Sequence, residues 1–224
     1  MIFDHYDRIR IVNLPERQDR REETDQELQR IGWRSHPKID YFPALRMSDP
    51  GPFLRVGSHG NFLGQLQILE DALAAQQTVL IMEDDCRFLP AISTFTPASD
   101  TDILYGGFEW ASMPENLPDA DIIGSHCMGF SLPAIERLVP FLKSLLDLST
   151  QIDPAIVRSE FNPQIRPPID GAYVWFRRYN PDLKTEFASV ACQRSSATDV
   201  GDRRWFDNYP VTRSIARYLR RLRG

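Results

Sequence analysis

The chain has 224 residues, of which 42% are hydrophobic and 25% charged, proportions typical of a soluble globular domain. The net charge of −5 argues against general nucleic-acid binding, so we expect no nucleic-acid partner. The three cysteines form no CxxC pair, no stretch approaches the roughly 20 apolar residues of a membrane span, and the first residues lack the apolar core of a signal peptide. We therefore expect a cytoplasmic protein.

The chain opens with a strand and a helix. The segment 8–14, "RIRIVNL", alternates apolar residues and predicts a strand. The segment 19–32 predicts a helix, with Asp19 and Glu22 spaced as a capping box and Gly32 as its stop. This order begins a β–α–β unit.

A second helix and strand follow a long connection. Residues 33–56 are rich in Pro, Ser and Asp and predict a loop. Residues 57–77 predict a helix, and 78–82, "TVLIM", a strand buried on both faces. Two β–α–β steps in this space predict an α/β fold with a mixed, mainly parallel sheet flanked by helices.

The second half predicts shorter elements and a basic tail. In chain order we expect strands at 102–108 and 126–132, a helix at 133–148 kinked at Pro140, an extended loop at 162–170, a segment at 171–176 that fits helix or strand, and a strand at 187–193. Residues 1–210 would form the catalytic domain. Residues 211–224 predict a basic amphipathic helix, which either packs on its own domain or rests on the anionic inner membrane.

Three carboxylates directly follow the apolar strand 78–82. In an extended segment Glu83 and Asp85 point to one side and Asp84 to the other. The first two could hold a hard divalent cation, Mn²⁺ or Mg²⁺, against the oxygens of a diphosphate. The alternative is an exposed acidic turn without a ligand. Among the arginines after the first strand, Arg17 in the turn is the better phosphate-binding candidate, while Arg20 and Arg21 are expected at the surface.

The order of these motifs resembles glycosyltransferase family 25, which includes bacterial lipooligosaccharide galactosyltransferases and collagen galactosyltransferase domains. The matching blocks are "IRIVNLPERQDRRE", "GSHGNFLGQLQILEDALAAQQTVLIMEDD", "CMGFSLPAIERLV", "PPID" and "CQRSSATDV", spread over roughly residues 8–200. The chain departs from the family's Cys-x-x-Ser-His pattern, because Gly64 and Gln65 stand where the family has Ser-His.

The resemblance implies a glycosyltransferase-A fold and an inverting, metal-assisted transfer of a hexose from a UDP-sugar, UDP-galactose by family habit. It implies Asn13 and Leu14 near the base, Arg17 near the phosphates, Asp84 near the ribose or sugar, and Glu83 and the catalytic Asp85 as metal ligands. The "PPID" match implies that Asp170 is the general base. Asp170 as a helix N-cap is the alternative, and Asp199, Glu109 and His126 are weaker candidates for the base.

The expected function is therefore hexose transfer to a cell-surface glycan, such as lipopolysaccharide, or to a lipid-linked acceptor. Two alternatives remain open from the residues. One is a metal-dependent nucleotidyltransferase or nucleotide-sugar hydrolase that uses the same carboxylates. The other is a non-catalytic domain that binds a glycan or a partner protein, which the departure at Gly64 and Gln65 would fit.

Overall fold

A six-stranded sheet forms the centre of the protein in a computed structural model that describes residues 1–110, 120–157, 162 and 164–194. Its strand order is β2-β1-β3-β6-β5-β7. The strands are β1 (Arg8–Asn13), β2 (Ile39–Pro43), β3 (Val79–Glu83), β5 (Ile103–Trp110), β6 (Ile122–Phe130) and β7 (Thr185–Phe187). β1 runs parallel to β2 and β3, β5 runs parallel to β7, and β6 alone is reversed, pairing antiparallel with β3 and β5. The expected α/β class, with a mixed and mainly parallel sheet, is confirmed.

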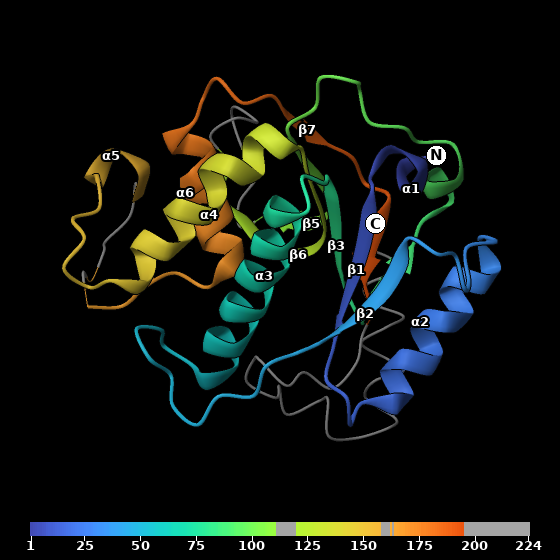
Figure 1. Ribbon diagram of the computed structural model, residues 1–224, viewed down its shortest axis with the longest axis horizontal. Coiled ribbons are helices and arrows are strands. Elements are labelled where there is room, and N and C mark those ends of the chain that lie inside the picture. Colours follow the sequence, from blue (N-terminus) through green and yellow to red (C-terminus); the bar gives the residue numbers. More distant parts are fainter. Residues whose placement is uncertain (111–119, 158–161, 163, 195–224) are drawn as a thin grey trace.

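Helices cover both faces of the sheet (Figure 1). One layer holds α3 (Val56–Ala74), α4 (Leu132–Leu146) and α6 (Ile169–Tyr179), which contact one another. The other holds α2 (Gln18–Arg30), the short α1 (Ile2–His5), and a two-stranded sheet of β4 (Cys86–Phe88) and β8 (Ala191–Gln193). A 3-10 turn (Pro90–Ser93) and α5 (Pro154–Val157) complete the described elements. The helices thus flank the sheet as expected.

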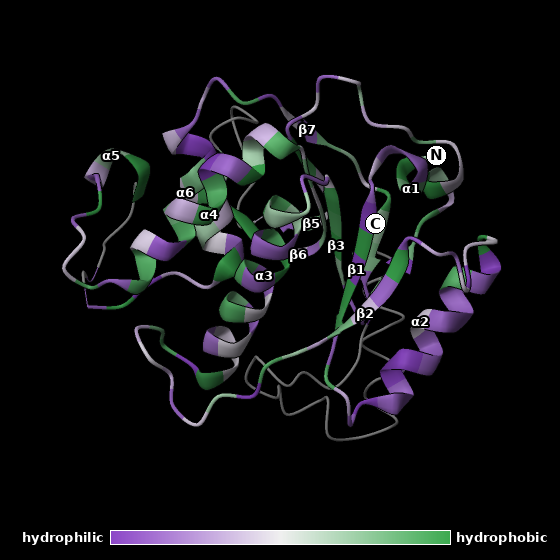
Figure 2. Ribbon diagram, in the orientation of Figure 1, coloured by the Kyte–Doolittle hydropathy of each residue, from purple (hydrophilic) through white to green (hydrophobic). Residues whose placement is uncertain are grey.

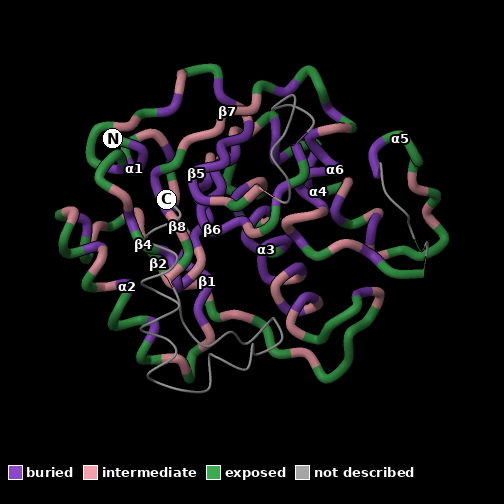
Figure 3. The backbone as a smooth tube through the Cα atoms, turned by 180° about the vertical axis from the view of Figure 1, so that it is seen from behind, coloured by how far each residue is buried: buried purple, intermediate pink, exposed green. Residues whose placement is uncertain are grey.

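The strand β3 is buried on both faces, as its continuous apolar sequence predicted. Val79 and Ile81 belong to the core under α3, α4 and α6, while Leu80 and Met82 belong to the core on the α1 and α2 side. Figure 3 shows the central strands as buried along most of their length. Because β3 is an interior strand in the order β2-β1-β3-β6-β5-β7, its end and the carboxylates after it lie between neighbouring strands and not at an edge strand.

Several expected boundaries differ from the structure. The loop expected at 33–56 contains β2, which was missed because its residues are only partly buried and sit in a polar, Pro-rich segment. The expected capping box is wrong: α2 begins at Gln18, and its N-cap is Arg17 without a side-chain cap. The strand expected at 187–193 is the two short strands β7 and β8, which join different sheets.

The remaining segments answer the open questions in part. Residues 171–176, ambiguous in sequence, lie in α6. Figure 2 shows α2 as mostly hydrophilic, in contrast to the central strands, yet its row of Arg20, Thr24 and Leu28 is buried. The predicted tail 211–224 and Asp199 lie outside the described residues. Within the described residues, no helix has the length and apolar character needed to cross a membrane.

Candidate active site

A cavity of about 500 Å³ lies where β3 ends. Glu83 is the last residue of β3, and Asp84 and Asp85 form the turn into β4. All three carboxylates line the cavity, together with residues from β5, β6 and the first turns of α3 and α6. The carboxyl end of a buried strand is where open α/β sheets bind their ligands. The acidic triplet is therefore part of a cavity wall and not an isolated turn on the surface.

Glu83, Asp85 and His126 form a three-residue cluster in this wall. One ligand atom from each, two carboxylate oxygens and a ring nitrogen, lie within 4.8 Å of one another. His126 Nδ1 is 3.4 Å from Glu83 Oε2. In the part of the chain that is described, Asp85 Oδ1 and His126 Nε2 are buried without a hydrogen-bond partner. Carboxylate and imidazole ligands fit a divalent cation such as Mn²⁺.

The electrostatics of the cluster favour a bound cation. Burial raises the pKa of Asp85, and the neighbouring Glu83 raises it further. Burial alone would lower the pKa of His126, but the hydrogen bond and charge of Glu83, with Asp85, outweigh it and raise the pKa. Negative charge is thus held at a buried place where it is poorly solvated. A divalent cation in the cluster would remove this penalty.

An irregular stretch of β6 brings His126 to the cluster. The pairing of β6 with β5 passes from Ile123–Glu109 to Cys127–Gly107, so four residue steps on β6 oppose two on β5. Gly124 lies in this bulge at φ +80°, and a Cβ there would lie 2.6 Å from the imidazole of His126. Bulges of this kind re-aim side chains next to functional sites. The sequence showed the glycine but not the bulge, so His126 was ranked only as a weak candidate base.

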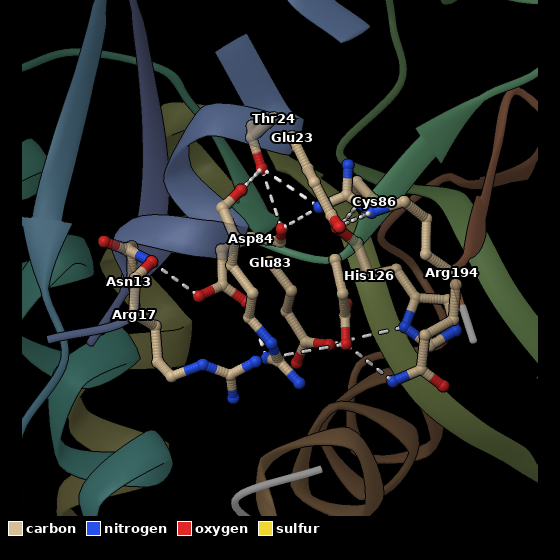
Figure 4. Close-up of polar contacts among 12 residues, drawn as sticks. Asn13, Arg17, Glu23, Thr24, Glu83, Asp84, Cys86, His126 and Arg194 are labelled. Carbon is tan, nitrogen blue, oxygen red and sulfur yellow. Dashed lines mark hydrogen bonds and ion pairs between the residues drawn. The ribbon is translucent and has the colours of Figure 1, made fainter. Parts of the chain in front are cut away.

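Asp84 is held by hydrogen bonds from the chain itself (Figure 4). Its carboxylate accepts hydrogen bonds from Asn13 Nδ2 at 2.7 Å and from Arg20 at 2.8 Å. Its carbonyl oxygen accepts from Thr24 Oγ1 at 2.7 Å and from Arg194. The expectation that Arg20 lies at the surface is therefore wrong. It is buried because it faces inward in the same helical row as Thr24 and Leu28, a signal present in the sequence.

Asp85 is positioned from β8, which the sequence did not link to the site. Gln193 Nε2 donates to Asp85 Oδ2 at 3.0 Å, and the Arg194 backbone N–H donates to the Asp85 carbonyl at 2.7 Å. Arg20 lies 3.8 Å from the same Oδ2. The small β4–β8 sheet thus fixes Oδ2 of Asp85, while Oδ1 has no hydrogen-bond partner among the described residues.

Asp170 lines the same cavity from the first turn of α6. It is not the N-cap, which is Pro168. Its Oδ2 accepts from the backbone N–H of Gly124 at 2.8 Å, and its Oδ1 accepts from that of Gly171 at 2.9 Å. Each carboxylate oxygen keeps a lone pair for a further partner. Asp170 is therefore held firmly beside the cavity and can still accept a proton.

The other expected residues are placed unevenly. Leu14 lines the cavity, and so does the exposed Glu109. Asn13 does not line it but binds Asp84 and the carbonyl of Arg17. Arg17 pairs with Asp19 at 2.9 Å and is not among the described lining residues. Contacts of Asn13 with a base and of Arg17 with phosphates remain predictions.

Comparison with known proteins finds a likeness among solved structures but none among protein families or curated proteins. No protein-family model matches the chain, and no curated protein matches it. Among solved structures, the chain is similar to a glycosyltransferase involved in the glycosylation of the major capsid of PBCV-1, with 10% sequence identity and a TM-score of 0.44. The match covers 84% of this chain and 94% of that one. The function is therefore inferred from the site itself.

Proposed function

We propose that this protein is a metal-dependent glycosyltransferase that moves a hexose from a UDP-sugar to a glycan acceptor. The carrying observation is the cluster of Glu83, Asp85 and His126, whose ligand atoms lie within 4.8 Å of one another in the wall of a cavity that also holds Asp170. The resemblance of the motifs further supports galactose as the hexose, an inverting transfer, and a cell-surface glycan such as lipopolysaccharide as the acceptor.

In this proposal Glu83, Asp85 and His126 hold the cation, and Gln193 keeps Asp85 oriented. A bound Mn²⁺ or Mg²⁺ supplies neutralisation of the diphosphate leaving group. Leu14, in the cavity wall next to β1, lies beside the nucleoside.

Asp170 would take the proton of the acceptor hydroxyl as that oxygen attacks the sugar. A general base must lie within hydrogen-bond reach of the hydroxyl and must stay ionised. The backbone N–H groups of Gly124 and Gly171 hold the Asp170 carboxylate in place beside the cavity. It comes from α6, whereas the metal ligands come from β3 and β6, so base and leaving group can lie on different sides of the sugar.

The test is calorimetric binding of UDP with and without Mn²⁺, on the wild type and on Asp85→Asn. We expect binding that requires Mn²⁺ and is lost in Asp85→Asn. Glu109→Gln is the matched control, because it neutralises a carboxylate of the same cavity outside the cluster, and it should keep Mn²⁺-dependent binding. Absence of UDP binding by the wild type in both conditions would favour the non-catalytic binding domain.

A second measurement separates the enzyme classes. Wild-type protein with Mn²⁺ and a UDP-sugar should release UDP only when an acceptor glycan is present. Release of UMP or pyrophosphate without an acceptor would instead identify a hydrolase or nucleotidyltransferase. Asp170→Asn should bind UDP like the wild type but lose transfer, because the amide cannot take a proton from the acceptor hydroxyl.

A further inference from the structure

A buried amide on α3 links the protein core to the cavity. Gln65 is fully buried, and its Nε2 donates to Asn61 Oδ1 at 3.1 Å. Its Oε1 accepts from the hydroxyl of Tyr173 on α6 at 2.7 Å. Asn61 lines the cavity that contains the carboxylate cluster, whereas Gln65 and Tyr173 do not. The three side chains form a row that ends at the cavity wall.

The hydroxyl of Tyr173 fixes the direction of every hydrogen bond in this row. Tyr173 is buried, and within the described part of the chain Gln65 is the partner of its hydroxyl. A buried O–H left without an acceptor is costly, so the hydroxyl donates and Gln65 must present its Oε1 to it. The Gln65 amide then presents Nε2 to Asn61, which must accept through Oδ1. The Nδ2 of Asn61, with its two N–H groups, is left for the cavity.

The position of Asn61 suits a neutral ligand group. Ser58, Asn61 and Gln65 are spaced by three and four residues and share one face of α3. Ser58 also lines the cavity and is nine-tenths buried. This wall offers an amide and a hydroxyl, with Arg55 at the start of α3 also lining the cavity, while the carboxylates of the cluster lie at the end of β3 and its histidine on β6. Phosphate oxygens fit the cluster and its cation, and sugar hydroxyls fit neutral donors of this kind.

We propose that Asn61 donates a hydrogen bond to a hydroxyl oxygen of the hexose in the nucleotide-sugar donor. Gln65, held by Tyr173, is the positioning residue that keeps the Asn61 amide turned to the cavity. This inference rests on the proposed function and adds the group that distinguishes one hexose from another. A site built to hydrogen-bond a substrate hydroxyl discriminates strongly against a sugar that lacks it at that position.

The experiment compares the affinities of UDP, UDP-galactose and UDP-glucose in the presence of Mn²⁺ by calorimetry. For the tighter of the two sugar nucleotides, Asn61→Ala should weaken binding about 3- to 10-fold, the loss expected for one hydrogen bond, and should leave UDP unchanged. Tyr173→Phe removes only the hydroxyl. It should weaken the binding of the sugar nucleotide by about 2- to 3-fold without changing the affinity for UDP. Its side chain does not line the cavity, so such a loss must pass through Gln65.

Tyr105→Phe is the matched control. Tyr105 is fully buried, and its hydroxyl has no hydrogen-bond partner in the residues that are described. Tyr105 is not part of the row of Asn61, Gln65 and Tyr173, so this variant should change neither the affinity for UDP nor that for the sugar nucleotide. Melting temperatures of all variants separate a loss of fold stability from a loss of sugar binding.

The outcomes are distinct. If Asn61→Ala weakens UDP and the sugar nucleotide equally, the contact is not to the hexose and the inference is wrong. If Tyr173→Phe lowers only the melting temperature, Gln65 and Tyr173 have a purely structural role and their positioning part is wrong. If the wild type binds UDP but Asn61→Ala does not change the affinity for either sugar nucleotide, this inference is wrong and the proposed function still stands. If the wild type does not bind UDP, the proposed function fails first.

Discussion

The two sides of the acidic triplet differ in how completely the chain satisfies their oxygens. On the α2 side, each Asp84 carboxylate oxygen has a partner, Asn13 or Arg20, and its carbonyl oxygen accepts from Thr24 and Arg194. On the cavity side, one Asp85 oxygen and one His126 nitrogen lack a partner among the described residues. The chain could have satisfied both sides with the same kinds of residues. The difference indicates that Asp84 has a structural role, whereas Asp85 and His126 are available to bind a ligand.

This contrast separates stability from function within adjacent residues. Mutations on the α2 side should mainly lower the free energy of unfolding, because they leave a buried charge without its partner. Mutations on the cavity side should mainly lower ligand affinity, since they remove groups that the fold leaves poorly satisfied. Each prediction below tests one side, from the largest expected change to the smallest.

The largest loss of stability should come from Arg20→Met. The ion pair of Arg20 with Asp84 is buried on both sides, and Asp85 lies nearby. Removing one partner of a buried pair leaves an uncompensated charge, so we expect a loss of about 3–5 kcal/mol in the free energy of unfolding. Urea denaturation measures it. Arg21→Met is the control, because Arg21 is exposed and stacks over Tyr41, and it should cost less than about 1 kcal/mol. Equal losses in the two variants would contradict the contrast.

Asp85→Asn should give the opposite result. Burial and the adjacent Glu83 raise the pKa of Asp85, so removing its charge relieves repulsion and should leave the stability without metal unchanged or slightly higher. Wild-type protein should gain about 2.7 kcal/mol when Mn²⁺ is present at 100 times its dissociation constant, and Asp85→Asn should gain almost nothing. Melting curves with and without MnCl₂ measure both effects. If the melting temperature of the wild type does not change with Mn²⁺, the assignment of a cation to the cluster is wrong.

A smaller effect is expected at the residue that orients Asp85. Gln193→Ala removes the hydrogen bond to Asp85 Oδ2 but none of the three candidate ligands. Removing a residue that orients a metal ligand typically lowers metal affinity by about 10-fold or more. We therefore expect the Mn²⁺ dissociation constant to rise about 10-fold. Gln193→Glu would add a like charge beside Asp85 and should weaken the affinity further. Unchanged affinity in both variants would show that β8 does not position the site.

The sequence predicted the part of the site that is contiguous in the chain. The apolar run before Glu83 marks a buried strand, as the structure has it, but Asp84 and Asp85 lie in the turn after β3, where strand alternation does not apply. His126 and Gln193 could not be placed this way. They lie 43 and 108 residues from their partners in the triplet, and they arrive through a bulge in β6 and a second sheet. Strand order and bulges depend on packing between distant segments, which no local pattern records.

The smallest effect should come from the exposed counterpart of the Arg20 pair on the same helix. Arg17 hydrogen-bonds Asp19, and this contact lowers the pKa of Asp19 from 3.8 to about 2. Because the folded pKa is the lower one, the pair contributes above the unfolded pKa, and its contribution is lost as the pH falls through about 2. Solvent screens this exposed pair, so Asp19→Asn should cost no more than about 0.5 kcal/mol near pH 7.

Urea denaturation of wild type and Asp19→Asn from about pH 7 down to about pH 3 measures this difference, which should shrink as the pH falls. Added salt should also reduce it, whereas the loss in Arg20→Met should persist because buried charges are poorly screened. A salt-insensitive loss above about 2 kcal/mol in Asp19→Asn would contradict the assignment of this pair to the solvent-screened side of the comparison. The ion pairs of Arg17 with Asp19 and of Arg20 with Asp84 would then contribute similar free energies, although one is exposed and the other buried.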